Sequence, residues 1–345
     1  MLPINRILIS RMKYIGDIVL TTPVIRAVRE KYPEAYIAYL GDKRAVSLLE
    51  HNPYLDEIIP FDFSKPDIFE QPRVAFLLRK RKFDVFIDLF SNPRTAMLAW
   101  ASRAPIRIGK DVKGRGRLYT HRIGDYGALK PAIEFHYQYV LPIGVGMTHF
   151  KTEIFLTDDE KREARIFLKH QDVDVAKPIV AIHIGASWPN KVWLKENFVE
   201  LIDAVRAKLG AEIIVSYGPG DEELVGDIME HAFGKVSQLP LLPLRQLAAI
   251  LSLSNVFVSN DCGPMHIGVA VGTPTIGIFG PEPPEVWFNY AREDGHTALF
   301  RKIECSPCRT TKCFREGEHF MECMKLITVT QVYEEVRRRL VAGSS

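Results

Sequence analysis

The sequence predicts an α/β protein built from two doubly wound parallel-sheet domains. Its 345 residues suit two domains of roughly 150 residues each. In each half, short apolar β-rich runs alternate with segments long enough for helices, which is the pattern of a parallel sheet covered by helices. With 47% hydrophobic and 25% charged residues, the chain has the composition of a globular protein that buries a core.

The first half, residues 1–150, opens with a strand at residues 6–10, a polar loop that ends in Gly16-Asp17, and a helical pattern that continues to Lys31. Pro23 is expected in the first turn of that helix, where its missing N–H costs little. Further strands are expected at residues 36–40, 57–60, 84–89 and 106–108.

The pattern loosens between residues 139 and 157, so we expect the domain boundary at residues 150/151. A new helix starts at the acidic cluster 158–160, because acidic residues favour the N-terminal end of the helix dipole. The second half, residues 151–345, repeats the plan and ends in an amphipathic helix at about residues 330–340, which in such an architecture can cross back to the first domain. Strands of this half are expected at residues 179–184, 212–217, 256–259 and 275–279.

The composition and the missing motifs argue against several classes of protein. No apolar run approaches the roughly 18 residues that a membrane span needs, and early charges leave no room for a signal-peptide core, so we expect a cytoplasmic protein. The net charge of only +3 argues against a general nucleic-acid binder. No Gly-x-Gly-x-x-Gly follows the first strand and no Gly-x-x-x-x-Gly-Lys occurs, which speaks against dehydrogenases and nucleoside triphosphatases.

Doubly wound folds bind ligands beyond the carboxyl ends of their strands, so the loops that follow strands are the candidate sites. The loop after the first strand carries Arg11, Lys13, Gly16 and Asp17. Gly16 lets the backbone approach a ligand closely, and Asp17 presents a carboxylate at the start of a helix. Taken alone, Asp17 is also explained as a helix N-cap.

Two loops of the second half suit a nucleotide. Residues 185–192 offer small residues, the hydroxyl of Ser187 and the ammonium of Lys191 ahead of a helix, which together resemble a diphosphate cradle; a solvated loop explains them equally well. After the next strand, Gly218 stands in a turn and Glu222 opens a helix, where a carboxylate can accept hydrogen bonds from ribose hydroxyls. Capping of the helix dipole explains the same acid without a ligand.

The strongest local signal is the segment 259–266. Asp261 and Gly263 bracket a strand-to-helix turn, and Pro264 suits the first helical position. His266 lies in the first turn of that helix, at the edge of the sheet where an anion is expected. Such a turn binds phosphate or ribose through its backbone amides.

Together these motifs resemble the bacterial ADP-heptose:lipopolysaccharide heptosyltransferase family. They read Gly16-Asp17-Ile18-Val19-Leu20-Thr21-Thr22-Pro23, Gly185-Ala186-Ser187 with Lys191-x-Trp193, Gly218-Pro219-Gly220, and Asn260-Asp261-x-Gly263-Pro264-Met265-His266. The resemblance covers nearly the whole chain in the right order. It implies a GT-B fold, with two Rossmann-like domains facing a central cleft, and an inverting transfer of L-glycero-D-manno-heptose from ADP-heptose. The implied acceptor is the inner core of lipopolysaccharide, of the Kdo-lipid A type, reached by peripheral contact with the inner membrane.

The resemblance also implies roles for residues. Asp17 is expected to be the general base, with Arg11, Lys13 and Gly16 on the acceptor side. The donor is expected to contact Gly185, Ser187, Lys191, Gly218, Glu222, Asp261, Gly263, Pro264 and His266. A shift of one residue would give the role of Glu222 to Asp221 or Glu223. No metal or other cofactor is expected, because fixed N–H groups and an ammonium can stabilise the leaving diphosphate.

Each of two further features of the sequence has two possible interpretations. Seven Lys or Arg residues lie between Arg103 and Arg122, which suits either an acidic acceptor or a solvated loop. Four cysteines form the pattern Cys-x2-Cys-x4-Cys-x9-Cys, and four thiolates can hold zinc or an iron–sulfur cluster, but the spacing matches no standard zinc ribbon and the resemblance implies no metal. The four are Cys305, Cys308, Cys313 and Cys323.

Other functions also fit parts of the pattern. A GT-B nucleotide-sugar epimerase would convert the donor without an acceptor, and a transferase could use another nucleotide-sugar. A binding module that senses nucleotide-sugars or lipopolysaccharide is a third class. Retention of both Asp17 and the Lys191 loop speaks against that module.

Overall fold

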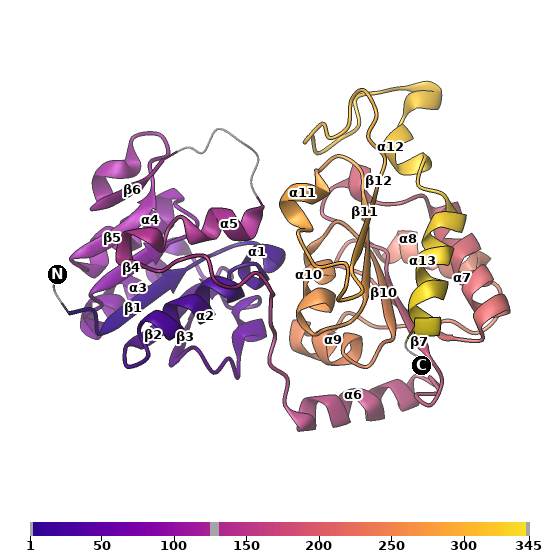
Figure 1. Cartoon of the computed structure of the whole chain (residues 1–345), viewed down its shortest axis with the longest axis horizontal. Coiled ribbons are helices and arrows are strands. Elements are labelled where there is room, and N and C mark those ends of the chain that lie inside the picture. The colour runs from indigo at the N-terminus through magenta and orange to yellow at the C-terminus, as the bar shows by residue number, and fades with distance from the viewer. Residues whose placement is uncertain (1–2, 125–130, 343–345) are drawn as a thin grey trace. The chain divides into compact units, whose positions relative to one another are not determined.

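The computed structural model describes residues 3–124 and 131–342, and the chain divides into two compact units, residues 1–155 and 156–345 (Figure 1). The expected boundary at residues 150/151 lies in the segment between the 3₁₀ turn η3 (Leu141–Ile143) and helix α6 (Asp158–His170). Each unit holds one six-stranded sheet with its own helices.

The N-terminal unit is built around a fully parallel sheet of order β3-β2-β1-β4-β5-β6. Its elements are β1 (Arg6–Ser10), α1 (Ile15–Val19), α2 (Thr22–Lys31), β2 (Tyr36–Asp42), β3 (Glu57–Phe61), α3 (Asp67–Arg81), β4 (Val85–Asp88), α4 (Pro93–Ser102), β5 (Ile106–Lys110), the 3₁₀ turn η2 (Arg115–Leu118), β6 (His121–Ile123) and α5 (Ala132–Tyr137).

The C-terminal unit repeats the same plan, with a parallel sheet of order β12-β11-β10-β7-β8-β9. Its elements are α6 (Asp158–His170), β7 (Ile179–His183), α7 (Lys195–Leu209), β8 (Glu212–Ser216), α8 (Glu222–His231), β9 (Ser237–Gln238), α9 (Leu244–Leu251), β10 (Val256–Asn260), α10 (Gly263–Ala270), β11 (Thr275–Phe279), α11 (Pro284–Trp287), β12 (Thr297–Phe300), α12 (Glu322–Lys325) and α13 (Val329–Ala342).

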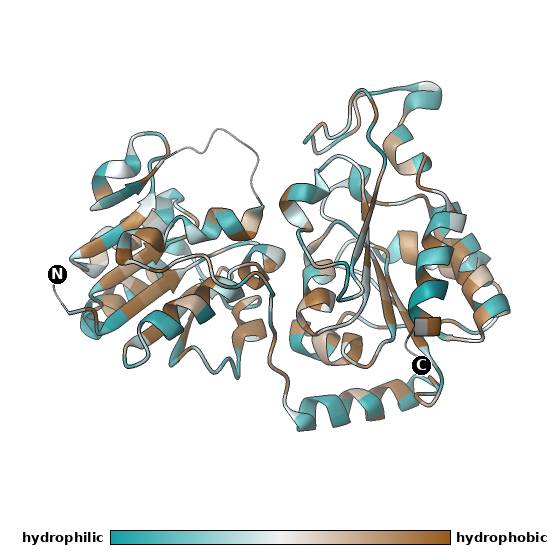
Figure 2. Cartoon of the chain, in the orientation of Figure 1, coloured by the Kyte–Doolittle hydropathy of each residue, from teal (hydrophilic) through white to brown (hydrophobic). Residues whose placement is uncertain are grey.

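Both sheets have the Rossmann strand order, in which the first strand lies centrally and the direction of winding reverses beside it. The central strands are buried along their whole length because helices cover both faces of each sheet. Figure 2 shows this as brown strands inside each unit, with teal concentrated on the outer helices. The predicted fold class, two Rossmann-like parallel-sheet domains, is confirmed. No described helix has the length and apolarity that crossing a membrane would require.

The predicted helix from the first loop to Lys31 is two helices, since the chain breaks at Leu20-Thr21 between α1 and α2. Pro23 does lie in the first turn of α2, as expected. The sequence patterns also missed three strands, each at an edge of its sheet, where apolar periodicity is weak. They are β6, β9 and β12.

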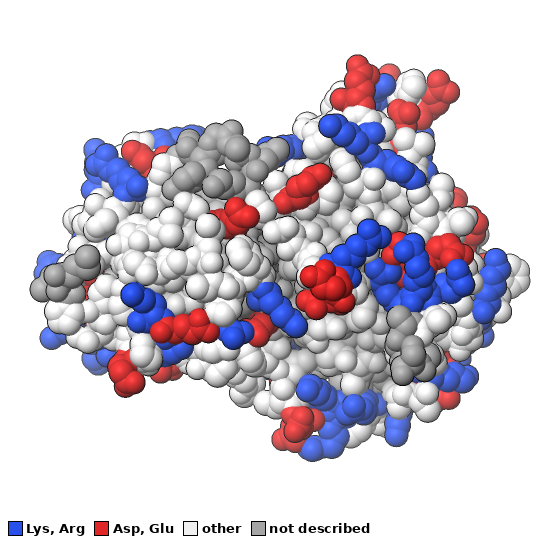
Figure 3. Space-filling view, in the orientation of Figure 1, with Lys and Arg blue, Asp and Glu red and all other residues white. Residues whose placement is uncertain are grey.

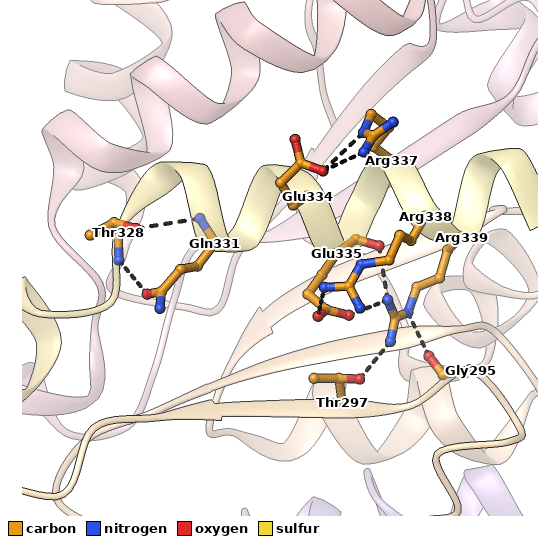
Figure 4. A network of polar contacts seen from close by, with 9 residues as sticks. All are labelled: Gly295, Thr297, Thr328, Gln331, Glu334, Glu335, Arg337, Arg338 and Arg339. Atoms are coloured by element: carbon orange, nitrogen blue, oxygen red, sulfur yellow. Dashed lines mark hydrogen bonds and ion pairs between the residues drawn. The ribbon is translucent and has the colours of Figure 1, made fainter.

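The last helix, α13, belongs to the C-terminal unit, and a crossing back to the first unit stays a prediction. It packs against α7 within the C-terminal unit, and its apolar side chains join that unit's core. A polar network also connects α13 to the start of the edge strand β12 (Figure 4). Arg339 donates to the Gly295 carbonyl at 2.7 Å and to Thr297 Oγ1 at 2.5 Å, while Glu335 accepts from Arg339 Nη1 at 2.5 Å and from Arg338.

We expect Glu335→Ala to lower the free energy of unfolding by about 3 kcal/mol, because it leaves the buried guanidinium of Arg339 without its carboxylate. Glu334 provides the matched control, since it pairs with Arg337 on the exposed side of the same helix. Glu334→Ala should cost about 0.5 kcal/mol or less. Urea unfolding of both variants measures the difference, and equal losses would show that the network does not anchor α13.

Candidate functional site

The candidate residues of the N-terminal unit gather at the carboxyl end of β1, where the winding of the sheet reverses. Asp17 is the third residue of α1, and its Oδ2 accepts from the backbone N–H of Tyr14 at 3.1 Å, so it closes a capping box and is not the N-cap itself. Its other oxygen accepts from Arg11 Nη2. Both side chains are largely buried, at 13% exposure for Arg11 and 11% for Asp17.

Arg11 is itself held from the neighbouring strand. Its Nη1 donates to the Leu89 carbonyl at 2.8 Å, and its guanidinium lies 4.9 Å from the centre of the Phe90 ring. Both partners follow β4, the strand beside β1 in the sheet. Lys13 points elsewhere, with its Nζ 4.4 Å from the centre of the Phe63 ring. The structure therefore brings Arg11, but not Lys13, to the carboxylate of Asp17.

Asp88, at the end of β4, is a residue that the sequence patterns did not single out. Its carboxylate is fully buried and accepts from the Tyr119 hydroxyl at 2.6 Å and from the Ser91 N–H at 2.9 Å. Burial raises the pKa of Asp88. These bonds shape the turn that presents the Leu89 carbonyl to Arg11, so Asp88 is a positioning residue. The sequence did carry a signal for Asp88, because an acidic residue there ends an otherwise apolar strand.

The corresponding point of the C-terminal unit lies between β7 and β10. Asn260, the last residue of β10, donates from Nδ2 to the Ile184 carbonyl at 2.5 Å and accepts at Oδ1 from the Trp193 N–H at 3.0 Å. One side chain thereby holds both ends of the loop that carries Ser187 and Lys191. Ser187 is exposed on this loop.

Lys191 and Asp261 form an ion pair of 2.7 Å at the start of α10, with 12% and 6% of the two side chains exposed. The ammonium also lies 4.4 Å from the centre of the Trp188 ring. Burial raises the pKa of Asp261, and the charge of Lys191 opposes that rise. Gly263 and Pro264 open helix α10 two residues after Asp261, and the N-terminus of a helix favours an anion.

His266 is buried in the same helix, and its Nδ1 shares a hydrogen bond of 2.6 Å with the Tyr290 hydroxyl. The side chain is thus engaged within the unit, and its contact with a donor stays a prediction.

The acidic residues after β8 separate into two roles. Glu222 is exposed and accepts from the Gly220 N–H at 2.8 Å. Asp221 instead turns inward, where its Oδ2 accepts from the Gly218 N–H at 3.1 Å and lies against Gly185. Burial raises the pKa of Asp221. Of the alternatives open in the sequence, Asp221 is the carboxylate that borders the loop from Gly185.

With the nucleotide that the sequence predicts for this loop, Gly185→Ala should weaken ADP binding by about tenfold, because a Cβ at residue 185 would come within 1.9 Å of the carboxylate oxygen of Asp221. Asp221 then has to leave its bond to Gly218, which alters the loops on both sides. Gly226→Ala is the matched control, because a Cβ there meets no atom within 4 Å. Calorimetric titration with ADP tests this expectation, and unchanged affinity in Gly185→Ala would contradict it.

The basic run from Arg103 to Arg122 is partly structural. Three of its side chains donate to backbone carbonyls: Arg107 to Leu118, Arg115 to Ser91 and Arg122 to Gly116. Others, such as Lys113 and Arg117, are exposed. On the face drawn in Figure 3, basic and acidic side chains are interspersed, in keeping with the net charge of +3.

The four clustered cysteines line one small pocket of the C-terminal unit, together with Asn190 and His319. All four are free thiols, and burial next to the other thiols raises the pKa of Cys323 to about 11. Within residues 3–124 and 131–342, no three His, Cys, Asp or Glu side chains are arranged as ligands of one ion. Cys262 lies apart, where burial raises its thiol pKa to about 12.

Comparison with known proteins covers most of the chain. The family model of glycosyltransferase family 9 (heptosyltransferase) matches residues 73–319. Lipopolysaccharide heptosyltransferase 3 of Escherichia coli is 26% identical over 295 residues, which are 80% of this chain and 84% of that protein.

Two solved structures share the fold over nearly the whole length. A glycosyl transferase of family 9 from Veillonella parvula has a TM-score of 0.86 at 25% identity, covering 98% of this chain and 97% of the other. The E. coli ADP-heptose lipopolysaccharide heptosyltransferase II has a TM-score of 0.81 at 18% identity, covering 99% and 100%.

Proposed function

The chain belongs to glycosyltransferase family 9, the heptosyltransferases, and we propose that it transfers L-glycero-D-manno-heptose from ADP-heptose to the inner core of lipopolysaccharide. The names of its relatives support this donor and this acceptor. The observation that carries the proposal is the pair of charged constellations at the two sheet reversals, Arg11 with Asp17 and Lys191 with Asp261.

In this proposal, Asp17 is the general base of an inverting displacement. Its carboxylate accepts the proton of the acceptor hydroxyl while that oxygen bonds to the anomeric carbon and the bond to the diphosphate breaks. The bonds from Arg11 and from the Tyr14 N–H hold the carboxylate in one orientation. This orientation matters because proton transfer requires the carboxylate of Asp17 to lie within hydrogen-bond distance of the acceptor hydroxyl.

Lys191 and the start of α10 are proposed to bind the diphosphate of the donor. The ammonium has three protons and forms an ion pair with the Asp261 carboxylate, so Lys191 is oriented and still able to donate to a phosphate. The positive end of the helix dipole at the start of α10 favours negative charge as well. Asp221 or Glu222 serves the ribose. Because Lys191 and the start of α10 supply positive potential, we propose that transfer needs no metal. Excess EDTA should therefore leave the rate of transfer unchanged.

The acceptor of Kdo-lipid A type is anchored in a bilayer, so we further propose that the enzyme works in peripheral contact with the inner membrane, at its cytoplasmic face. Asp17, Arg11 and the backbone at Gly16 are proposed to meet the sugar part of this acceptor. The ammonium of Lys13, which lies over the Phe63 ring, is proposed to contact the charged groups of the acceptor.

A thermal-shift panel of ADP-, UDP- and GDP-sugars, followed by transfer assays, tests the function. A ligand present at about 100 times its dissociation constant stabilises the folded protein by about 2.7 kcal/mol, so ADP and ADP-heptose should raise the melting temperature by several degrees. A preference for UDP or GDP forms would contradict the assigned donor. Conversion of ADP-heptose without any acceptor would indicate an epimerase instead.

A further inference from the structure

The outer face of α3 and α4 exposes an unusual number of large apolar side chains. The two helices pack against each other, and a shallow groove between them is lined mostly by apolar residues. Phe76 is 72% exposed and Trp100 is 55% exposed. The exposed apolar residues of this face are Ile68, Phe69, Phe76, Met97 and Trp100. Exposed large apolar side chains on two helices that pack together are typical of a surface that contacts another apolar phase.

The same two helices end in positive charge. The last turn of α3 is basic and its C-cap is Lys82, while the C-cap of α4 is Arg103. Arg81 pairs with Glu57. The other basic side chains at these ends are exposed and form no ion pair with any residue that the structure describes: Arg79, Lys80, Lys82 and Arg103. The C-terminal ends of both helices thus add, to the exposed apolar side chains, cations that pair with no described residue.

This face, which we call the α3–α4 face, also borders the edge of the sheet where the proposed base lies. Helix α4 follows β4, and the turn between them carries the Leu89 carbonyl that holds Arg11. An ion pair between Arg94 and Asp67 joins the first turns of the two helices at that edge. The apolar side chains therefore start next to the catalytic edge, and the basic helix ends lie at the far end of the face.

We propose that the α3–α4 face docks on a bilayer that contains anionic phospholipid. Tryptophan, phenylalanine and aliphatic side chains insert at the boundary of head groups and acyl chains, and unpaired Lys and Arg side chains attract anionic head groups. This charge complementarity distinguishes a bilayer from a purely apolar partner. The inference rests on the proposed function, because docking there brings Asp17 to a sugar that a lipid anchor holds near the membrane.

Flotation of the full chain with vesicles of phosphatidylcholine, with and without phosphatidylglycerol, tests the proposal. The parent protein should bind only the anionic vesicles and should dissociate at high salt. Phe76→Ser with Trp100→Ser, and separately Lys80→Glu with Lys82→Glu, should each lower binding by about tenfold or more. All four side chains are exposed, so both variants should keep the parent melting temperature.

Matched controls come from the C-terminal unit. Phe233 is 80% exposed and Lys169 is exposed, so Phe233→Ser and Lys169→Glu should bind vesicles within about twofold of the parent. Parent-like vesicle binding by the face variants, or an equal loss in the controls, would overturn the proposal.

The outcome for docking can be told apart from the outcome for function. With an acceptor dispersed in detergent, the face variants should transfer heptose at the parent rate, and their thermal shift with ADP-heptose should be unchanged. If the function were wrong but docking right, the parent would bind anionic vesicles without responding to ADP-heptose.

Discussion

The Asp17→Asn variant should transfer heptose about 10³-fold more slowly than the parent, with ADP affinity unchanged. The asparagine amide can still accept the hydrogen bond from the Tyr14 N–H, so the capping of α1 is retained, but it accepts no proton from an acceptor hydroxyl. Steady-state kinetics should show the loss in kcat, because a base acts in the transition state and contributes little to donor binding.

Asp84→Asn is the matched control for Asp17. The Asp84 carboxylate also accepts from backbone N–H groups, at 2.8 Å from Asn5 and from Arg6, but it lies at the opposite, amino-terminal edge of the same sheet. Its variant should therefore lose some stability and keep the parent rate. Parent-like activity in Asp17→Asn, or an equal loss of kcat in Asp84→Asn, would remove Asp17 from the role of base.

The second large effect is expected at Lys191. Lys191→Met should lower kcat/KM for ADP-heptose by about 10²-fold, since a positive donor to the leaving diphosphate is lost. The same variant should also lose about 3 kcal/mol of stability, because the buried carboxylate of Asp261 is left without its partner. Kinetics and urea unfolding measure the two effects separately.

A double variant distinguishes the two roles of Lys191. Lys191→Met with Asp261→Asn removes both charges, so it should regain much of the stability while donor use stays low. Lys195→Met serves as the control, because Lys195 pairs with Asp227 at an exposed position of the same unit. If donor use returned together with stability in the double variant, Lys191 would be structural only.

The sequence predicted the fold from local patterns, and it did so best where burial is greatest. The central strands β1, β7, β10 and β11 lie within one residue of their predicted bounds, because apolar runs buried on both faces are visible in a single sequence. The strands β6 and β9 were missed because each forms an outer strand of only a few residues.

The candidate site was predictable as a set of loops but not as a set of contacts. The sequence placed Asp17 at a helix start, yet its position as third residue and not N-cap depends on how Tyr14 begins the helix. The sequence left Asp221, Glu222 and Glu223 as alternatives. Asp221 turns inward while Glu222 is exposed, and this difference depends on Gly185, which leaves room for the Asp221 carboxylate. Gly185 lies in the loop after β7, whereas the acids follow β8.

By itself, the sequence determined the two Rossmann-like sheets and the loops at which a ligand would bind, because strand and helix periodicity and the position of loops are local properties of the chain. Only the tertiary structure decided which charges meet. Arg11 reaches Asp17 because Leu89 and Phe90, which follow the neighbouring strand β4, hold its guanidinium. Lys191 reaches Asp261 because Asn260 holds the loop that carries Lys191. It likewise decided that α13 stays on α7, since packing of an apolar helix face depends on which surface the finished sheet leaves uncovered.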